Sequence, residues 1–247
     1  MSFIKEYIVE FNDMDRFGEL SAVKLLDFFE ETAFYHLENG YGYEKLAKDN
    51  KAWILNKWKI DMKQFPKYHN KFTVKTWCSY CKGFRAYRDF VVLDENNELL
   101  GKATSLWIFY DTNLKRPKKI PTEMINLFYC KDEEISINDF QDFKPSNNYN
   151  VYKELRIQRN DIDVNNHVNN KVFINWMEES IEEEIYSNYK LHSFEVNYLK
   201  EIKYSIDSIY SCNNVKKIEK NCHEFEHFIT ANKIGYALGT TSWKKYK

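Results

Sequence analysis

Residues 160–179 read NDIDVNNHVNNKVFINWMEE, and residues 12–31 read NDMDRFGELSAVKLLDFFEE. The two stretches align without a gap at an offset of 148 residues (160 − 12), with five identities in twenty positions. The identities are the opening Asn-Asp-x-Asp and the closing Glu-Glu, and apolar positions such as Phe28 and Trp176 also match. An internal repeat of this kind predicts two copies of one structural unit.

The sequence around each copy shows the same order of expected elements. An alternating run precedes each Asn-Asp-x-Asp turn, and a helix follows it, over about 20–37 in the first copy and 170–186 in the second. We therefore predict an α+β fold in which each unit packs one long helix on an antiparallel sheet. The expected strands after the helices are 52–62, 70–80, 84–94 and 99–111, then 193–202, 205–220, 223–232 and 236–246.

The domain boundaries follow from this order. We expect a first unit over 1–120 and a second unit over 149–247. The intervening segment 121–148 is polar and acidic toward its end, so it is interpreted as a linker with a short helix over TEMINLFY (122–129).

Composition excludes several classes of protein. The 247 residues are 43% hydrophobic and 30% charged, as is typical of a globular chain, and the net charge is −1. No overall field indicates binding to nucleic acid, and no apolar stretch approaches the ~20 residues of a membrane span. The N-terminal run MSFIKEYIVEF alternates like a strand rather than a signal peptide, so we expect a cytoplasmic protein.

The five cysteines are few and scattered, which argues against a disulfide framework. Cys78 and Cys81 have the CxxC spacing of some zinc and redox sites. They lie in a strand-like run with no second pair and no neighbouring histidine, so ordinary strand cysteines are the favoured interpretation. Neither a metal ion nor a cofactor is expected.

The stretch DIDVNNHVNNKVFINWMEES (161–180) is very similar to the D-x-N-x-H-V-N-N motif that opens the second helix of plant and bacterial acyl-ACP thioesterases. Parts of the first half resemble the same family: AWILNKWKI (52–60), RDF (88–90), ATSLWIFYD (103–111) and RPKKIP (116–121). The resemblance runs through nearly the whole chain. It implies a tandem, or double, hotdog fold, in which each long helix is wrapped by an antiparallel sheet, and it implies release of fatty acid from an acyl carrier protein.

The resemblance also implies a set of site residues. Asn165 and His167 match the motif, Asp163 opens it, and Glu201 in NYLKEI (197–202) matches a glutamate that the family carries on the first strand after the helix. Many plant members have a cysteine directly after that glutamate, whereas this chain has Ile202. A Cys–His nucleophile pair is therefore absent there, and we expect attack by water or transient attack by the carboxylate.

Residue chemistry agrees with this assignment but leaves simpler interpretations open. Asp163, Asn165 and His167 are two residues apart, which places them on one side of an extended segment, and histidine exchanges protons near neutral pH. The asparagines could instead only cap the helix and fill turns, and Glu201 could be a solvated carboxylate. Asp163 could be a turn residue, as Asp15 would be in the first copy.

The first copy provides an internal control. At the offset of 148, Phe17 matches Asn165 and Glu19 matches His167. The first unit therefore lacks the polar set, and we expect a single active site, in the second unit. The first unit is then free to hold the acyl chain, with Leu25, Phe28 and Phe29 as candidate contacts that could equally be plain core.

The expected partner is an acidic acyl carrier protein. Basic residues after the fourth strand of the first unit could receive it, although a solvated loop is an equal interpretation: Lys115, Arg116, Lys118 and Lys119, with Arg85 and Arg88 as further candidates. A monomer would suffice, and a homodimer is the alternative. Two other functions stay open, an acyl-CoA thioesterase of the same fold and a non-catalytic acyl-binding module. Acyl chain length and saturation are not predicted.

Overall fold

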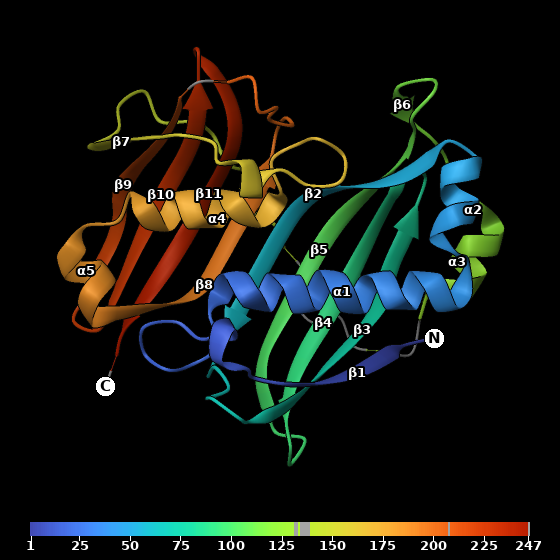
Figure 1. Ribbon diagram of the computed structural model, residues 1–247, viewed down its shortest axis with the longest axis horizontal. Helices are drawn as coiled ribbons and strands as arrows, with labels where there is room; N and C mark the ends of the chain where they lie inside the picture. Colours follow the sequence, from blue (N-terminus) through green and yellow to red (C-terminus); the bar gives the residue numbers. More distant parts are fainter. Residues whose placement is uncertain (131–132, 134–138, 207, 247) are drawn as a thin grey trace. The chain divides into compact units, whose positions relative to one another are not determined.

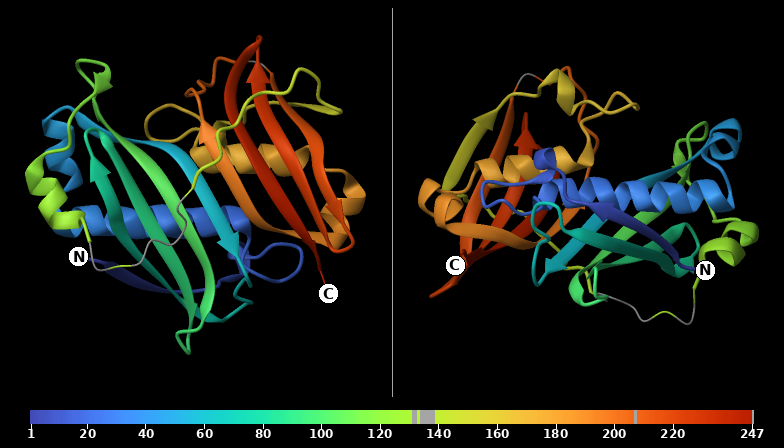
Figure 2. Two further views of the ribbon diagram at one scale, coloured as in Figure 1. Left: turned by 180° about the vertical axis from the view of Figure 1, so that it is seen from behind. Right: turned by 60° about the horizontal axis from the view of Figure 1, so that its bottom comes forward.

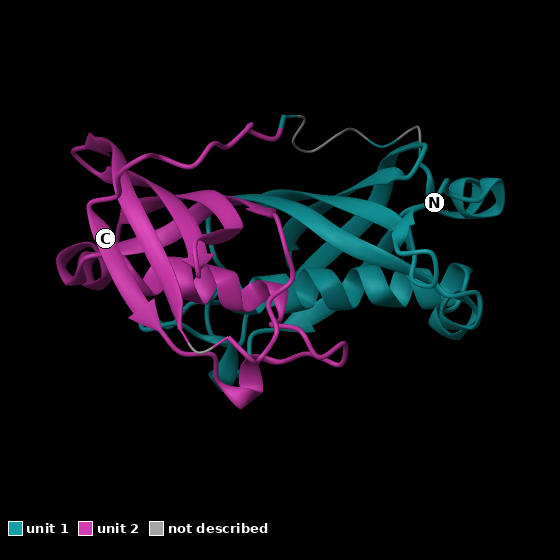
Figure 3. Ribbon diagram, turned by 90° about the horizontal axis from the view of Figure 1, so that it is seen from above, with its two compact units in different colours: residues 1–139 teal, residues 140–247 magenta. Residues whose placement is uncertain are grey.

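The computed structural model describes residues 1–130, 133, 139–206 and 208–246. The chain divides into two compact units, Met1–Asp139 and Phe140–Lys247, which Figure 3 shows in different colours. Each unit packs a helix on one face of an antiparallel sheet, as the views in Figures 1 and 2 show. The predicted α+β fold with two copies of one unit is therefore confirmed.

The first unit has its strands in the order β1-β3-β4-β5-β2, with β6 pairing with β5. The helix α1 (Ala22–Gly40) lies across one face of this sheet (Figure 1). The short helix expected within 121–148 is α3, and it packs in the first unit, where Met124 and Phe128 are buried. The remaining elements are β1 (Phe3–Ile8), η1 (Phe11–Asp13), α2 (Tyr43–Lys48), β2 (Lys51–Met62), β3 (Lys71–Lys82), β4 (Arg85–Asp94), β5 (Leu99–Asp111), β6 (Arg116–Pro117) and α3 (Thr122–Phe128).

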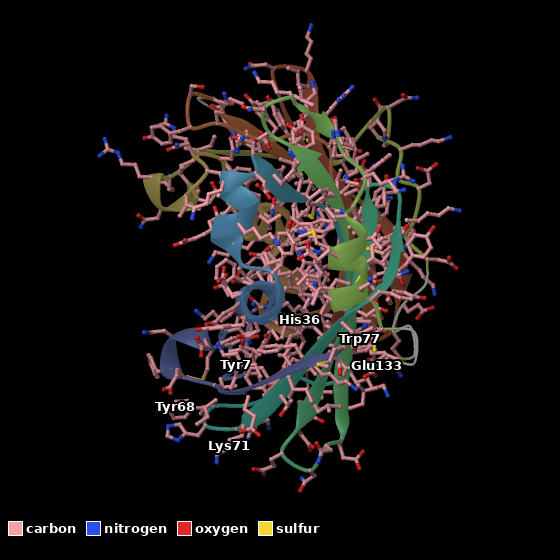
Figure 4. All side chains as sticks on the ribbon, turned by 90° about the vertical axis from the view of Figure 1, so that its right-hand side faces the viewer. Tyr7, His36, Tyr68, Lys71, Trp77 and Glu133 are labelled. Atoms are coloured by element: carbon pink, nitrogen blue, oxygen red, sulfur yellow. The ribbon has the colours of Figure 1, made fainter. Side chains whose placement is uncertain are left out.

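The core of the first unit is aromatic. Ser21 caps α1 by accepting a hydrogen bond from the Lys24 amide, and the helix then buries an apolar face that includes Phe29. The Phe29 ring packs against Trp58 of β2 and Phe90 of β4, with ring centroids 5.7 Å and 4.9 Å apart. In Figure 4, His36 lies on α1 and Tyr7 lies on β1 beside it, where Tyr7 donates a hydrogen bond to Phe28 O. Trp77, also labelled there, is on β3.

The second unit repeats this arrangement with the strand order β8-β11-β10-β9-β7. Its helix α4 (Asn170–Glu179) buries Phe173, Trp176 and Met177 against the sheet. The remaining elements are β7 (Val151–Leu155), η2 (Arg159–Asp161), α5 (Glu183–Asn188), β8 (Tyr189–Tyr198), β9 (Ile209–Glu219), β10 (Cys222–Ala231) and β11 (Ile234–Lys245).

Two predicted elements of the second unit were wrong. The single helix expected over 170–186 is divided into α4 and α5, because the chain leaves α4 at Ser180, whose hydroxyl donates to Met177 O (2.9 Å). The strand expected over 193–202 ends at Tyr198, which is the last residue paired with β11. Glu201 therefore lies in the loop after β8 and not on a strand.

Candidate active site

The loop from Asp163 to Val168 is organised by one carboxylate. Asp163 Oδ1 accepts hydrogen bonds from the backbone amides of Asn165 (2.8 Å) and His167 (3.1 Å). The Asp163 amide in turn donates to His167 O (2.8 Å), and the Asn166 amide donates to Asp163 O (3.1 Å). These bonds close a tight turn in which Asn166 has a positive φ of 61°. The backbone of the motif is thus held by Asp163 and needs no substrate to form.

Two further backbone contacts place this loop. The Asn169 amide donates to Asp161 O (2.8 Å), just before α4 begins. The Val168 amide donates to Ile202 O (2.8 Å), which ties the loop after β8 to the motif. The sequence singled out Ile202 only because it stands where many plant members have a cysteine. In the structure, its backbone carbonyl holds the Val168 end of the motif. A backbone carbonyl has no sequence signal, so this role could not be predicted.

The anchor at Ile202 brings Glu201 against His167. Glu201 Oε2 is 3.3 Å from His167 Nε2, and the two side chains are 58% and 24% exposed. A neutral imidazole that bonds to a carboxylate through Nε2 carries its proton there, which leaves a lone pair on Nδ1. The half-buried histidine therefore has one nitrogen fixed by an acid and the other able to accept a proton.

Asn165 is exposed on the same loop, two residues before His167. Its side-chain amide donates one hydrogen bond to Asp163 Oδ2 (3.2 Å). A side-chain amide has two N–H groups, so a second donor remains for a ligand. Asp163 consequently orients Asn165 through both its backbone and its side chain.

The other asparagines of the motif have structural roles. Asn169 is the N-cap of α4 and accepts a hydrogen bond from the Lys171 amide (3.1 Å). Asn166 occupies the left-handed position of the turn, where asparagine is tolerated. The Asn170 carbonyl accepts from the Tyr198 hydroxyl (3.1 Å). The interpretation as a cap and a turn residue therefore fits Asn169 and Asn166. The contact of Asn170 is made by its backbone and assigns no role to its side chain.

The first unit has a loop with the same hydrogen bonds. Asp15 Oδ1 accepts from the amides of Phe17 (2.9 Å) and Glu19 (3.4 Å). The Asp15 amide donates to Glu19 O (2.8 Å), and the amide of Gly18, which has a φ of 73°, donates to Asp15 O (3.1 Å). The repeat found in the sequence therefore extends to individual backbone contacts.

The corresponding anchor shows what the first unit lacks. The Leu20 amide donates to Pro66 O (2.8 Å), so Pro66 takes the place of Ile202. The residue before it, in the place of Glu201, is Phe65, which is buried. With Phe17 and Glu19 on the loop, the first copy has neither a histidine nor a facing carboxylate at this position.

The other predicted residues lie elsewhere. Leu25, Phe28 and Phe29 are on α1 and are buried in the core of the first unit. The Ile120 amide donates to Gly83 O (2.8 Å), which places the basic loop beside the β3–β4 turn and Arg85. Arg88 does not belong to that surface. It donates to His36 Nδ1 (3.0 Å) and Thr76 Oγ1 inside the unit, where burial lowers its pKa.

Within the residues that the structure describes, no group of three or more His, Cys, Asp and Glu side chains is placed to hold a metal ion. Over the same residues, no helix has the length and apolar character needed to cross a membrane.

Comparison with known proteins identifies the family. Residues 1–128 match the acyl-ACP thioesterase N-terminal domain, and residues 144–245 match the acyl-ACP thioesterase C-terminal domain. A chloroplastic acyl-[acyl-carrier-protein] hydrolase of Cuphea viscosissima is 26% identical over 238 residues, covering 89% of this chain and 57% of that protein. A chloroplastic palmitoyl-acyl carrier protein thioesterase of Gossypium hirsutum is 29% identical over 191 residues, which cover 72% of this chain and 46% of that protein. The chain thus spans about half the length of the curated relatives it matches.

Solved structures share the fold. An acyl-ACP thioesterase from Bacteroides thetaiotaomicron superimposes with a TM-score of 0.85 at 24% identity, covering 98% of each chain. A 12:0-ACP thioesterase from Umbellularia californica gives a TM-score of 0.86 at 19% identity, covering 99% of this chain and 94% of that one. The predicted tandem hotdog fold is confirmed. Since the N-terminal domain match alone covers more than half of the 247 residues, the chain belongs to the acyl-ACP thioesterase family.

Proposed function

We propose that this chain hydrolyses the thioester of fatty acyl-acyl carrier protein and releases the free fatty acid. The observation that carries the proposal is the contact between His167 Nε2 and Glu201 Oε2, on a loop whose duplicate in the first unit has neither residue. A proton-accepting histidine next to an exposed amide is what thioester hydrolysis requires, since water must be activated and the carbonyl oxygen polarised. The family's named members act on the same class of substrate.

In the proposed mechanism, Glu201 holds His167 in the tautomer with the proton on Nε2. A water molecule loses a proton to Nδ1 as its oxygen attacks the thioester carbon. The Asn165 amide donates a hydrogen bond to the carbonyl oxygen, which becomes negatively charged in the tetrahedral intermediate. When the intermediate collapses, the C–S bond breaks and the departing thiolate takes the proton from the imidazolium.

Water is the preferred nucleophile because no thiol lies at the matching position. Ile202 is fully buried, and its carbonyl accepts a hydrogen bond from the Val168 amide of the motif. The two cysteines of the second unit, Cys212 and Cys222, lie on β9 and β10, whereas the motif precedes α4. Attack by the Glu201 carboxylate would give a mixed anhydride, and water attacking its glutamyl carbon would leave one enzyme oxygen in the fatty acid. Single-turnover hydrolysis in ¹⁸O water tests this route, because direct attack by water always labels the fatty acid and unlabelled fatty acid on the first turnover requires the anhydride.

The first unit is proposed to hold the acyl chain against Leu25, Phe28 and Phe29 of α1. Phe28 is the least buried of the three, at 9% exposed, so it is the one a chain reaches with least rearrangement. Phe28→Ala is therefore expected to shift the acyl chain-length profile toward longer chains. An unchanged chain-length profile in Phe28→Ala would show that Phe28 does not contact the acyl chain.

The carrier protein is proposed to dock on the exposed basic loop of Lys115, Arg116, Lys118 and Lys119, together with Arg85. Carrier proteins are acidic, and opposite charges steer association. Lys118→Glu with Lys119→Glu is expected to raise KM for acyl-ACP about tenfold. KM for acyl-pantetheine, which has no protein surface, should not change. An equal rise for both substrates would contradict docking on this surface.

One experiment decides between the candidate functions. The purified chain is assayed with acyl-ACP and acyl-CoA esters of matched chain length, next to His167→Ala. Faster turnover of acyl-ACP supports the proposal, and much faster turnover of acyl-CoA supports the alternative on the same fold. Acyl-ligand binding without turnover of either would indicate a non-catalytic module. The cytoplasmic location and the choice between monomer and homodimer stay predictions, which fractionation and light scattering test.

A further inference from the structure

A bulge in β3 places Cys78 and Cys81 on the same side of the sheet. Residues three apart in a regular strand face opposite sides. Here the register with β4 shifts between Cys78 and Tyr80, so Cys78 pairs with Arg88 and Cys81 pairs with Ala86. Residues 86 and 88 are two apart on β4 and share a face. The extra residue of the bulge therefore brings both thiols to that face as well.

The two thiols lie in one apolar cluster. Cys78 is 4% exposed in the cluster that contains Ala86, Phe109 and Phe128, and the half-buried Cys81 packs against the same cluster. The neighbouring Cys81 thiol lowers the pKa of Cys78, whereas Cys78 and burial raise the pKa of Cys81. Cys78 Sγ donates a hydrogen bond to Tyr80 O (3.4 Å). The Arg88 guanidinium further lowers the pKa of both.

This arrangement has the features of a reactive dithiol. A CxxC pair beside a cation is a setting in which one thiolate is stabilised, and a bulge permits the close approach that an i, i+3 disulfide requires. Among the described residues, no third His, Cys, Asp or Glu side chain is placed to complete a metal site with the pair. Both are free cysteines on β3, as expected, and the bulge adds their common face.

We propose that Cys78 and Cys81 form a reversible dithiol–disulfide site that is oxidised by a low-molecular-weight or protein disulfide, RSSR. The more accessible Cys81 sulfur attacks RSSR, a mixed disulfide forms at Cys81, and the departing RS⁻ takes up the Cys81 proton. The Cys78 sulfur then attacks the Cys81 sulfur, the Cys78–Cys81 bond forms, and the second RS⁻ leaves. The two thiol protons end on the released thiols, and two electrons pass from the cysteines to RSSR. The site uses no residue of the His167 loop, so it does not depend on the proposed hydrolysis.

Trypsin isolates this site cleanly. Cleavage after Lys75 and Lys82 gives the peptide TWCSYCK (76–82), which contains both cysteines. The other three cysteines fall in separate peptides, namely 120–131, 204–216 and 221–233. The full-length folded protein is equilibrated in glutathione redox buffers, quenched with acid, alkylated, digested and analysed by mass spectrometry.

The expected product is peptide 76–82 lacking two hydrogen atoms and carrying no alkyl group. Treatment with dithiothreitol before alkylation should return the reduced peptide with two alkyl groups. Its equilibrium constant with glutathione should exceed that of the urea-unfolded chain by at least about tenfold, because the fold already holds the sulfurs together. Cys130→Ser should behave as wild type, and Cys81→Ser should give no internal disulfide. Two alkyl groups on 76–82 at every redox ratio would overturn the proposal. So would a link from Cys78 to Cys130, whose amide donates to Cys78 O (2.9 Å), or an equilibrium constant no larger than that of the unfolded chain.

Discussion

The loop at Asp15–Leu20 in the first unit and the loop at Asp163–Val168 in the second have matching hydrogen bonds and different side chains. In both loops, an aspartate accepts hydrogen bonds from two backbone amides, and a residue with positive φ closes the turn. The amide that follows each turn donates to a backbone carbonyl in the loop after β2 or β8. Only the second loop presents Asn165 and a His167 facing Glu201.

The difference separates what the turn needs from what the chemistry needs. Asp163 has a counterpart in Asp15 with the same two amide contacts, so its main work is to hold the loop. The first loop forms the same turn with Phe17 and Glu19, so the turn does not require Asn165 or His167. Residues that one copy has and the other folds without are the ones to test for catalysis.

The largest expected effect comes from His167→Ala. Removing the proton acceptor should lower kcat for acyl-ACP by at least about 10²-fold, the contribution typical of general acid–base catalysis. The matched control is Glu19→Gln at the equivalent position of the first loop, which should leave kcat unchanged. Steady-state hydrolysis with circular dichroism on each variant checks both. Near-normal turnover by a folded His167→Ala would contradict the assignment.

Glu201→Gln is expected to lower kcat by about 10- to 100-fold, because the amide no longer fixes the imidazole tautomer as the carboxylate does. The adjacent exposed Lys200 offers a control, since Lys200→Gln alters the same loop without touching His167. Rates for the two variants under saturating substrate separate the roles. Equal, small losses in both would mean that Glu201 is only a solvated carboxylate.

Asp163→Ala and Asp15→Ala compare the turns directly. Each substitution leaves two backbone amides without their acceptor, so each should reduce the free energy of unfolding by about 1–3 kcal/mol. Only Asp163→Ala should also lower kcat, by about tenfold, since Asn165 and His167 lose their orientation. Urea unfolding and hydrolysis assays on the pair provide the measurement. A loss of activity in Asp15→Ala at matched stability would remove the distinction.

The smallest expected effect is at the positive-φ positions. Asn166→Ala and Gly18→Ala each force alanine into the left-handed region, which should lower the free energy of unfolding by about 1 kcal/mol. An added Cβ at Gly18 meets no atom within 4 Å, so its cost is conformational alone. Asn166→Gly, which relieves the backbone, should be close to neutral. Thermal unfolding of the three variants checks this, and a neutral Gly18→Ala would show that the turn is not held at this φ.

Strongly patterned elements were predicted well. The strand expected over 99–111 is β5 at Leu99–Asp111, because a long alternating run leaves one register that buries the apolar side. The helix over 170–186 and the strand over 193–202 were too long, since tertiary contacts at Ser180 and Tyr198 end elements that the local pattern would continue. The helix α2 was missed because it is only six residues long.

The site was predictable in part for the same kind of reason. Asp163, Asn165 and His167 are close in sequence, so their spacing alone brings them together. Glu201 is distant in sequence and was assigned only through the family resemblance. The Ile202 carbonyl that positions it is a backbone group, so the identity of the residue does not predict its role. The interior position of Arg88 and the common face of Cys78 and Cys81 depend on sheet pairing and a bulge, which a single sequence does not reveal.

The most direct test gives the second loop the side chains of the first. The double variant Asn165→Phe, His167→Glu keeps Asp163 and the turn, and its kcat for acyl-ACP is compared with that of the wild type at matched fold, checked by melting temperature. We predict a melting temperature near that of the wild type and a fall in kcat of at least about 10²-fold. A folded double variant that hydrolyses acyl-ACP at close to the wild-type rate would contradict the central claim that these two side chains separate the catalytic unit from its copy.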